Sequence, residues 1–274
     1  MNHLTIVFFR QSRILFIINL LIFLSLPMYT IIRSRFIDFS DVYYFIYFTV
    51  LFSFVFLQSS KISDGITTKK QKIYNYIIIP FTAHTVINLI GSIVMNSILS
   101  DKNPQNLQSS ITLQELFEQM ISDFYTGSEE VWRFATISIL CVMLSKIAFK
   151  RSVILHISIL TLAILISSFI FGWLHTFGYS SSWFDFNITV TLTTTGLCFA
   201  LLLIVTKNIW TVVITHILFN VSTSLGMYNM NLLLIWSQVS LLIVGLIGIH
   251  YLVKSRKPIF IRKVIEKISG SKGM

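Results

Sequence analysis

Long hydrophobic runs alternate along the chain with short polar segments. The first run, residues 14–32, is bracketed by Arg13 and Arg33 and at 1.5 Å per residue measures about 28 Å, enough to cross a bilayer core. No small-x-small cleavage site follows it, so we interpret it as a retained membrane helix and not as a signal peptide. Seven further runs lie at residues 42–57, 73–99, 129–149, 152–175, 187–206, 209–226 and 231–253. The pattern predicts an all-α, polytopic membrane protein, a bundle of about eight transmembrane helices.

The composition excludes the other broad classes of protein. Of the 274 residues, 54% are hydrophobic and 12% are charged, against roughly 45–50% and about 25% in soluble domains. A soluble globule of this size has too small a core to bury so much apolar surface, and disordered chains are polar and poor in aromatic residues. We find no internal repeat and no second soluble domain, so residues 1–274 are expected to form a single transmembrane domain.

The placement of the basic residues predicts an orientation. The chain has 21 Lys and Arg against 11 Asp and Glu, a net charge of +10. If the N-terminus is cytoplasmic, 17 of the basic residues fall on the inner side, where loops accumulate positive charge. The four on the outer side are Arg33, Arg35, Lys102 and Arg133. This asymmetry predicts an N-in, C-in topology. It favours residues 254–274 as a basic cytoplasmic tail that contacts anionic lipid, with no nucleic-acid partner.

The largest segment between the hydrophobic runs is the outer loop, residues 100–128. Within it, residues 111–125 repeat apolar positions at helical spacing, which predicts a short amphipathic helix at the outer membrane interface. Its acidic residues Glu115, Glu118 and Asp123 are expected to form a solvated face.

Acidic residues begin the fourth hydrophobic run. Glu129 and Glu130 stand there as a pair, and Arg133 follows at helical spacing from both. The structural interpretation is an N-terminal dipole effect with a helix ion pair. The functional interpretation follows from the free energy of membrane insertion. An ionisable group inside a span costs about 2.5–3.5 kcal/mol, so it is expected to have a partner or a functional role.

Two histidines also lie within or at the ends of hydrophobic runs. His175 ends the fifth run four residues after Phe171, and His216 lies in the seventh run with Asn220 one helical turn later, on the same face. Each alone is more often an interhelical hydrogen bonder, which is the role we expect for His84.

Together these three clusters have the composition of a hydrolytic site. Peptide hydrolysis needs a base that activates water and donors that stabilise the oxyanion. A glutamate with His175 suits the first task, and His216 with Asn220 suits the second. Alternatively, Glu129, His175 and His216 could hold a divalent metal such as Zn²⁺, whose bound water is acidic. The residue pattern leaves open whether the cofactor is a zinc ion or none.

The three clusters resemble the motifs of the CPBP intramembrane proteases, the family of the CAAX prenyl endopeptidases and of bacterial bacteriocin-processing or immunity (Abi) proteins. That family carries EExxxR, then FxxxH, then HxxxN or HxxxB, each on its own transmembrane helix. Here FxxxH is Phe171 to His175 and HxxxN is His216 to Asn220. The resemblance is carried by residues 128–220 and implies a CPBP-like core at about 111–226. It implies Glu129, Glu130, His175, His216 and Asn220 as catalytic residues, supported by Arg133 and Phe171.

The first motif is one residue shorter than the family pattern. Aligning the glutamates makes Glu129 the water-activating residue and places Arg133 one position early. Aligning the Trp132–Arg133 pair puts Ser128 at the catalytic position, which would make the chain a pseudoprotease. We favour the first alignment because the catalytic carboxylate is chemically irreplaceable, whereas the arginine can reach from an adjacent position.

The resemblance implies an endopeptidase that cleaves a membrane-associated peptide or protein. The Ile-, Lys- and Phe-rich composition suits a bacterium of low GC content, so we expect a multi-pass protein of the bacterial plasma membrane that acts in bacteriocin or pheromone processing or in self-immunity. The alternatives are a noncatalytic scaffold or immunity protein that binds a partner, and a transporter. No inverted repeat supports the last.

Overall fold

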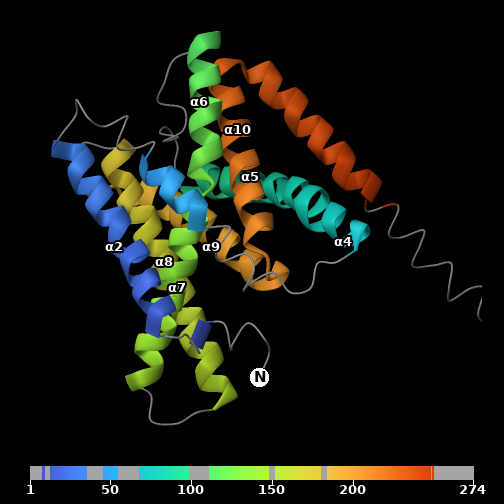
Figure 1. Cartoon of the computed structure of the whole chain (residues 1–274). Coiled ribbons are helices and arrows are strands. Elements are labelled where there is room, and N and C mark those ends of the chain that lie inside the picture. Colours follow the sequence, from blue (N-terminus) through green and yellow to red (C-terminus); the bar gives the residue numbers. More distant parts are fainter. Residues whose placement is uncertain are drawn as a thin grey trace, which may run out of the picture.

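All described segments of the chain are helical. The computed structural model describes residues 8–9, 13–35, 46–54, 68–98, 111–147, 152–179, 184–247 and 249. Its helices are α2 (Arg13–Arg35), α4 (Lys69–Ile73), the π-helix η2 (Tyr74–Ile78), α5 (Ile79–Ile98), α6 (Leu113–Thr126), α7 (Glu129–Ile147), α8 (Val153–Tyr179), α9 (Phe186–Thr206) and α10 (Ile209–Tyr228), followed by Met230–Ile247. Figure 1 shows them as a bundle in which α6 and α10 run side by side. The expectation of an all-α fold is confirmed for these residues.

Five of the eight expected spans correspond to helical segments long and apolar enough to cross a membrane. They are Gln71–Val94, Val153–Thr176, Phe186–Thr206, Ile209–Tyr228 and Met230–Ile247. These helices indicate a multi-pass membrane protein.

The other three expected spans are not confirmed. The run at 14–32 lies in α2, within which the described side chains give an apolar helical stretch at Arg13–Ser25. Only residues 46–54 of the run at 42–57 are described. The run at 129–149 corresponds to α7, which carries two glutamates, an arginine and a lysine. The basic tail at 254–274 lies outside the described residues, and the N-in, C-in orientation stays a prediction.

Helices α8 and α9 pack closely along each other. At Gly172 of α8, an added Cβ would lie only 2.5 Å from the Thr189 backbone oxygen and from Thr193 Oγ1. Only glycine therefore allows this approach of the two backbones. Gly172 lies three residues before His175, so this close contact fixes the part of α8 that carries the histidine.

Helix α10 contacts α5, α6, α7 and α9. Near its N-terminus, Thr211 Oγ1 donates to the backbone oxygen of Asn75 in η2 at 2.8 Å. In a π-helical turn the backbone hydrogen bonds join residues five positions apart. Directly after η2, α5 begins with Ile79 and Pro80, and proline has no N–H to donate. Farther along, Asn88 Nδ2 donates to Ser222 Oγ at 2.9 Å. These bonds fix α10 against its neighbours on the α5 side.

Helix α6 begins with a capping box. The Thr112 side chain accepts from the Glu115 backbone N–H at 3.2 Å, while Glu115 accepts from the Thr112 backbone N–H at 2.6 Å. These hydrogen bonds lower the pKa of Glu115 below its usual value. The expected helix at 111–125 is thus confirmed as Leu113–Thr126, and it packs antiparallel to the second half of α10 (Figure 1).

One part of the α6 prediction is wrong. Glu115 and Glu118 are exposed, but Asp123, expected on a solvated face, is buried against α10. Its Oδ2 accepts from Ser224 Oγ at 2.6 Å. The helix also exposes four apolar side chains, Leu113, Phe117, Ile121 and Phe124.

The last described helix, Met230–Ile247, diverges from α10 after the turn at Asn229 (Figure 1). Trp236 Nε1 donates to His84 Nε2 of α5 at 3.0 Å. His84 Nδ1 lies 3.3 Å from the backbone oxygen of Pro80, so both ring nitrogens have partners. The interhelical role expected for His84 is therefore confirmed.

Candidate active site at the start of α7

The turn between α6 and α7 is pressed against α10. A Cβ on Gly127 would lie 2.5 Å from Ile217 Cγ1 and 3.0 Å from the Val213 backbone oxygen. The backbone of Gly127 has ordinary right-handed helical angles, so glycine is required here for space and not for its conformational freedom. This contact sets the first turn of α7, with its two glutamates, directly against the helix that carries His216.

Glu130 lies at the centre of a closed polar network. Arg133 Nε donates to its Oε2 at 2.8 Å and Arg133 Nη2 to its Oε1 at 3.3 Å. His216 Nδ1 lies 2.9 Å from Glu130 Oε1. The side chains of Arg133 and Glu130 are 0% and 1% exposed. Burial of a charge is costly unless it is paired and hydrogen-bonded, and here one carboxylate satisfies two partners.

The guanidinium of Arg133 is held between aromatic rings. Its central carbon lies 4.2 Å from the centre of the Phe171 ring and 5.9 Å from that of Phe199, which are favourable cation–π distances. An added Cβ on Gly196 would lie 2.8 Å from Arg133 Nη1, so the absent side chain of Gly196 leaves room for the guanidinium. Although sequence counting placed Arg133 among the outer-side charges, it is fully buried.

Glu129 faces His175. Its Oε2 lies 3.6 Å from His175 Nε2, and both side chains retain some exposure, 9% and 22%. The His175 Nδ1 lies 2.8 Å from the Phe171 backbone oxygen. A carbonyl oxygen only accepts, so Nδ1 carries a proton and, in the neutral ring, Nε2 presents a lone pair towards the carboxylate. This pair is thus partly exposed, whereas the Glu130 network is buried.

His216 and Asn220 occupy one face of α10, as their spacing predicts. The His216 ring stacks on Phe199 with ring centres 4.6 Å apart. Asn220 is half-buried, and its Nδ2 donates to Thr126 Oγ1 of α6 at 2.8 Å. The structure thus brings together α7, α8 and α10 through the two glutamates and two histidines, and it pairs Asn220 with α6.

The two glutamates point to different partners, which bears on the shortened motif. Ser128, the catalytic position in the alternative alignment, donates from Oγ to the Phe48 backbone oxygen at 3.4 Å and is fully buried. The carboxylate that faces His175 belongs to Glu129. Arg133 binds Glu130, the second glutamate, from three residues away.

The residues fit a metal site poorly. Within the described part of the chain, no group of three or more His, Cys, Asp or Glu could hold a metal ion. Of the ligand set expected for zinc, Glu129 and His175 lie together, but His216 Nδ1 is taken by Glu130. We derive no step through a metal, and the zinc alternative stays a prediction.

Four residues near the site carry no motif and were missed in the sequence. Gly127 and Gly196 allow close approaches, Thr126 binds Asn220, and Asp123 binds Ser224. Burial raises the pKa of Asp123 to about 6, although the hydrogen bond from Ser224 acts to lower it. Gly127, two residues before the paired glutamates, is a sequence signal for close helix packing. The other residues carry no such signal.

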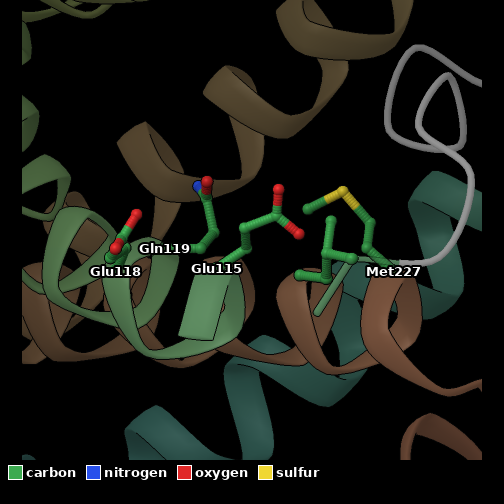
Figure 2. A pocket seen from close by; sticks show the side chains of 5 residues that line it. Glu115, Glu118, Gln119 and Met227 are labelled. Carbon is green, nitrogen blue, oxygen red and sulfur yellow. The ribbon is translucent and has the colours of Figure 1, made fainter. Parts of the chain in front are cut away.

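Two surface hollows lie along α6, and neither is lined by Glu129 or Glu130. One, of about 250 Å³, is lined by Ile111, Glu115, Glu118, Gln119 and Met227. Figure 2 shows the Glu115 and Glu118 carboxylates on its α6 side, with Met227 opposite. The other, of about 350 Å³, is lined by Phe117, Met120, Ile121, Phe124 and Tyr125. Neither is lined by a predicted catalytic residue.

One comparison with known proteins gives a match. Residues 127–222 match the family model described as type II CAAX prenyl endopeptidase Rce1-like. The segment begins at Gly127 and contains every predicted site residue, and it confirms the resemblance to the CAAX protease family over this part of the chain. No curated protein and no solved structure matches.

Proposed function

We propose that this chain, which carries a segment similar to the Rce1-like type II CAAX prenyl endopeptidases, is an intramembrane endopeptidase. The observation that carries the proposal is the partly exposed pair of Glu129 and His175, with 3.6 Å between Oε2 and Nε2. The distance is too long for a direct hydrogen bond, and both atoms accept when the imidazole is neutral. A water molecule beside them can donate one hydrogen bond to each.

Such a water is the nucleophile in the proposed reaction. Its oxygen bonds to the carbon of the scissile peptide while one of its protons passes to Glu129 Oε2. The carbonyl π electrons move to the oxygen, which becomes an oxyanion. When the carbon–nitrogen bond breaks, the proton held by Glu129 passes to the leaving amine, and the carboxylate is regenerated. His175 orients the water through Nε2, which the Phe171 carbonyl leaves unprotonated.

The oxyanion is stabilised from α10. Because His216 Nδ1 is bound to the Glu130 carboxylate, Nε2 remains for the substrate, and it donates only when the ring is protonated. The Asn220 amide has two N–H bonds, and one of them is used by Thr126. The second is available as the other donor.

This geometry supports aligning the two glutamates with the family motif. The Glu129 carboxylate faces His175, whereas the Ser128 hydroxyl is bound to the Phe48 backbone oxygen. A one-residue shift of Arg133 still leaves its guanidinium on Glu130. The shortened motif is also the feature that favours the second candidate, a noncatalytic scaffold or immunity protein.

The proposed substrate is a membrane-associated peptide or protein. The multi-pass character of the chain restricts the substrates that reach the pair to those in or at the bilayer. Within that class we propose bacteriocin or pheromone precursors of a bacterial plasma membrane, or a role in self-immunity.

The test is hydrolysis by the purified full chain in phosphatidylglycerol–phosphatidylethanolamine vesicles. A panel of peptides with apolar segments is incubated in H₂¹⁸O and analysed by mass spectrometry. We expect one ¹⁸O in the new carboxyl terminus, and no product from Glu129→Gln or His175→Ala. Thr223→Val is the matched control, since Thr223 donates only within α10 to the Phe219 oxygen. Equal cleavage by Glu129→Gln would contradict the mechanism, and binding of a peptide without cleavage would favour the scaffold.

A further inference from the structure

The end of α6 is joined to α10 next to the proposed oxyanion donor. Two side-chain hydrogen bonds cross this interface, from Asn220 Nδ2 to Thr126 Oγ1 at 2.8 Å and from Ser224 Oγ to Asp123 Oδ2 at 2.6 Å. In each helix the two residues are three or four positions apart, so the bonds follow one antiparallel edge. Asn220 is therefore held from a helix that carries none of the predicted catalytic residues.

The hydrogen bonds at Thr126 have a fixed direction. Its hydroxyl also lies 3.0 Å from the Asp123 backbone oxygen, to which it donates. A carbonyl oxygen has no proton to give, so the hydroxyl proton goes to Asp123 and the Thr126 oxygen accepts from Asn220. The chain of bonds thus requires the amide nitrogen, and not the amide oxygen, to face α6.

From this geometry we propose that Thr126 is a positioning residue that orients the Asn220 amide for oxyanion binding. One N–H of Nδ2 points to Thr126, which fixes the plane of the amide and the direction of the second N–H. The inference rests on the proposed function, because it gives that second N–H to the substrate oxyanion. Without the threonine hydroxyl the amide is free to rotate or to exchange its nitrogen and oxygen positions.

Neighbouring contacts hold Thr126 in place. The bond between Asp123 and Ser224 fixes the register of α6 along α10 one turn away. On the other side, Gly127 touches the α10 backbone at Val213. A shift of the last α6 turn would break the first contact and create a clash at the second. The hydroxyl is consequently held at one position relative to Asn220.

The test compares Thr126→Val with Thr126→Ser in the vesicle assay with the full chain. Valine has nearly the same shape but no hydroxyl, and we expect kcat to fall about tenfold or more with little change in KM. Serine restores the hydroxyl, and kcat should return to within about threefold of the wild type. Thermal unfolding checks that each variant is folded, and Thr223→Val serves as the matched threonine control.

A double-mutant cycle separates positioning from general stability. If Thr126 acts through Asn220, Thr126→Val has no further effect on kcat in an Asn220→Ala background. Wild-type kcat in Thr126→Val, or a full additional loss in the double variant, would overturn the proposal. These outcomes differ from failure of the proposed function, in which Glu129→Gln keeps its activity whatever happens at Thr126.

Discussion

Glu129 and Glu130 are adjacent in sequence but lie in different environments. Glu130 is 1% exposed and bound by Arg133 and His216 at 2.8 and 2.9 Å. Within the described residues, Glu129 forms an ion pair only with His175, at 3.6 Å, and its side chain keeps 9% exposure. One carboxylate is saturated with partners, whereas the other has acceptor capacity left for a substrate or water.

The difference follows from helix geometry. Adjacent residues of an α-helix project about 100° apart, so Glu130 turns towards α10 and Glu129 towards α8. We infer a division of roles in which Glu130 holds Arg133 and His216 in place, and Glu129 carries out the proton transfer. The following variants test this division, from the largest expected effect to the smallest.

Removing the Glu130 carboxylate should strongly reduce the stability of the fold. Glu130→Ala leaves the fully buried Arg133 without its counter-charge, a change that typically costs about 3–5 kcal/mol. We expect a large drop in the thermal unfolding temperature in detergent, followed by circular dichroism. Glu129→Ala is the matched comparison and should lose much less, since it leaves no fully buried charge without its counter-charge. Equal losses in the two variants would show that the two carboxylates are not separated in role.

Filling the space at Gly127 should pull the network apart. Gly127→Ala places a Cβ 2.5 Å from Ile217 and 3.0 Å from the α10 backbone, and overpacking of this kind costs about 1–3 kcal/mol. Because α7 must move away from α10, the contact of Glu130 with His216 should lengthen and cleavage should fall. Gly91→Ala in α5 is the control, because a Cβ there meets nothing within 4 Å. The account is wrong on this point if the two alanine variants unfold at the same temperature.

A third variant tests how Asp123, which supports the site from α6, makes the unfolding free energy depend on pH. The pKa of Asp123 is about 6 in the folded chain against an ordinary 3.8. The folded state therefore binds more protons between these pH values, so the unfolding free energy falls as pH rises from about 4 to about 6 and stays lowered above that. The full rise corresponds to about 3 kcal/mol.

Asp123→Asn removes this cost and keeps an oxygen that accepts from Ser224. We expect its unfolding temperature to exceed that of the wild type at pH 8 and the advantage to shrink at pH 5. Glu118→Gln changes an exposed acid of the same helix and should show no such trend. A stability advantage of Asp123→Asn that is equal at both pH values would rule out titration of this carboxyl as the cause.

Part of the fold was predictable because lipid imposes a simple pattern. Runs of about 20 apolar residues predicted the five candidate spans found in the described residues. The spacing at 111–125 predicted α6. The criterion fails for α7, whose glutamates face histidines of α8 and α10 and whose Arg133 pairs with Glu130 on the same helix. Hydropathy counts a charge in the same way whether or not it has a partner.

For the candidate site, the sequence predicted which residues would lie together but not which of them would pair. Spacing placed His216 and Asn220 on one face, and the motifs selected the two glutamates and His175. Which glutamate meets which histidine depends on the rotation of α7 about its axis, which is set by contacts such as Gly127 on α10. Asp123 was expected in solvent because an acid on an amphipathic helix usually faces water; its bond to Ser224 comes from the long-range packing of α6.

The most direct measurement of the central claim is a paired comparison of Glu129→Gln and Glu130→Gln. For each purified variant, kcat on one cleaved peptide and the unfolding temperature are measured under the same conditions. The division of roles predicts that Glu129→Gln unfolds like the wild type but loses about 10²–10⁴-fold in kcat, while Glu130→Gln unfolds at a clearly lower temperature. A folded Glu129→Gln protein with wild-type kcat, beside a folded and inactive Glu130→Gln protein, would contradict the account.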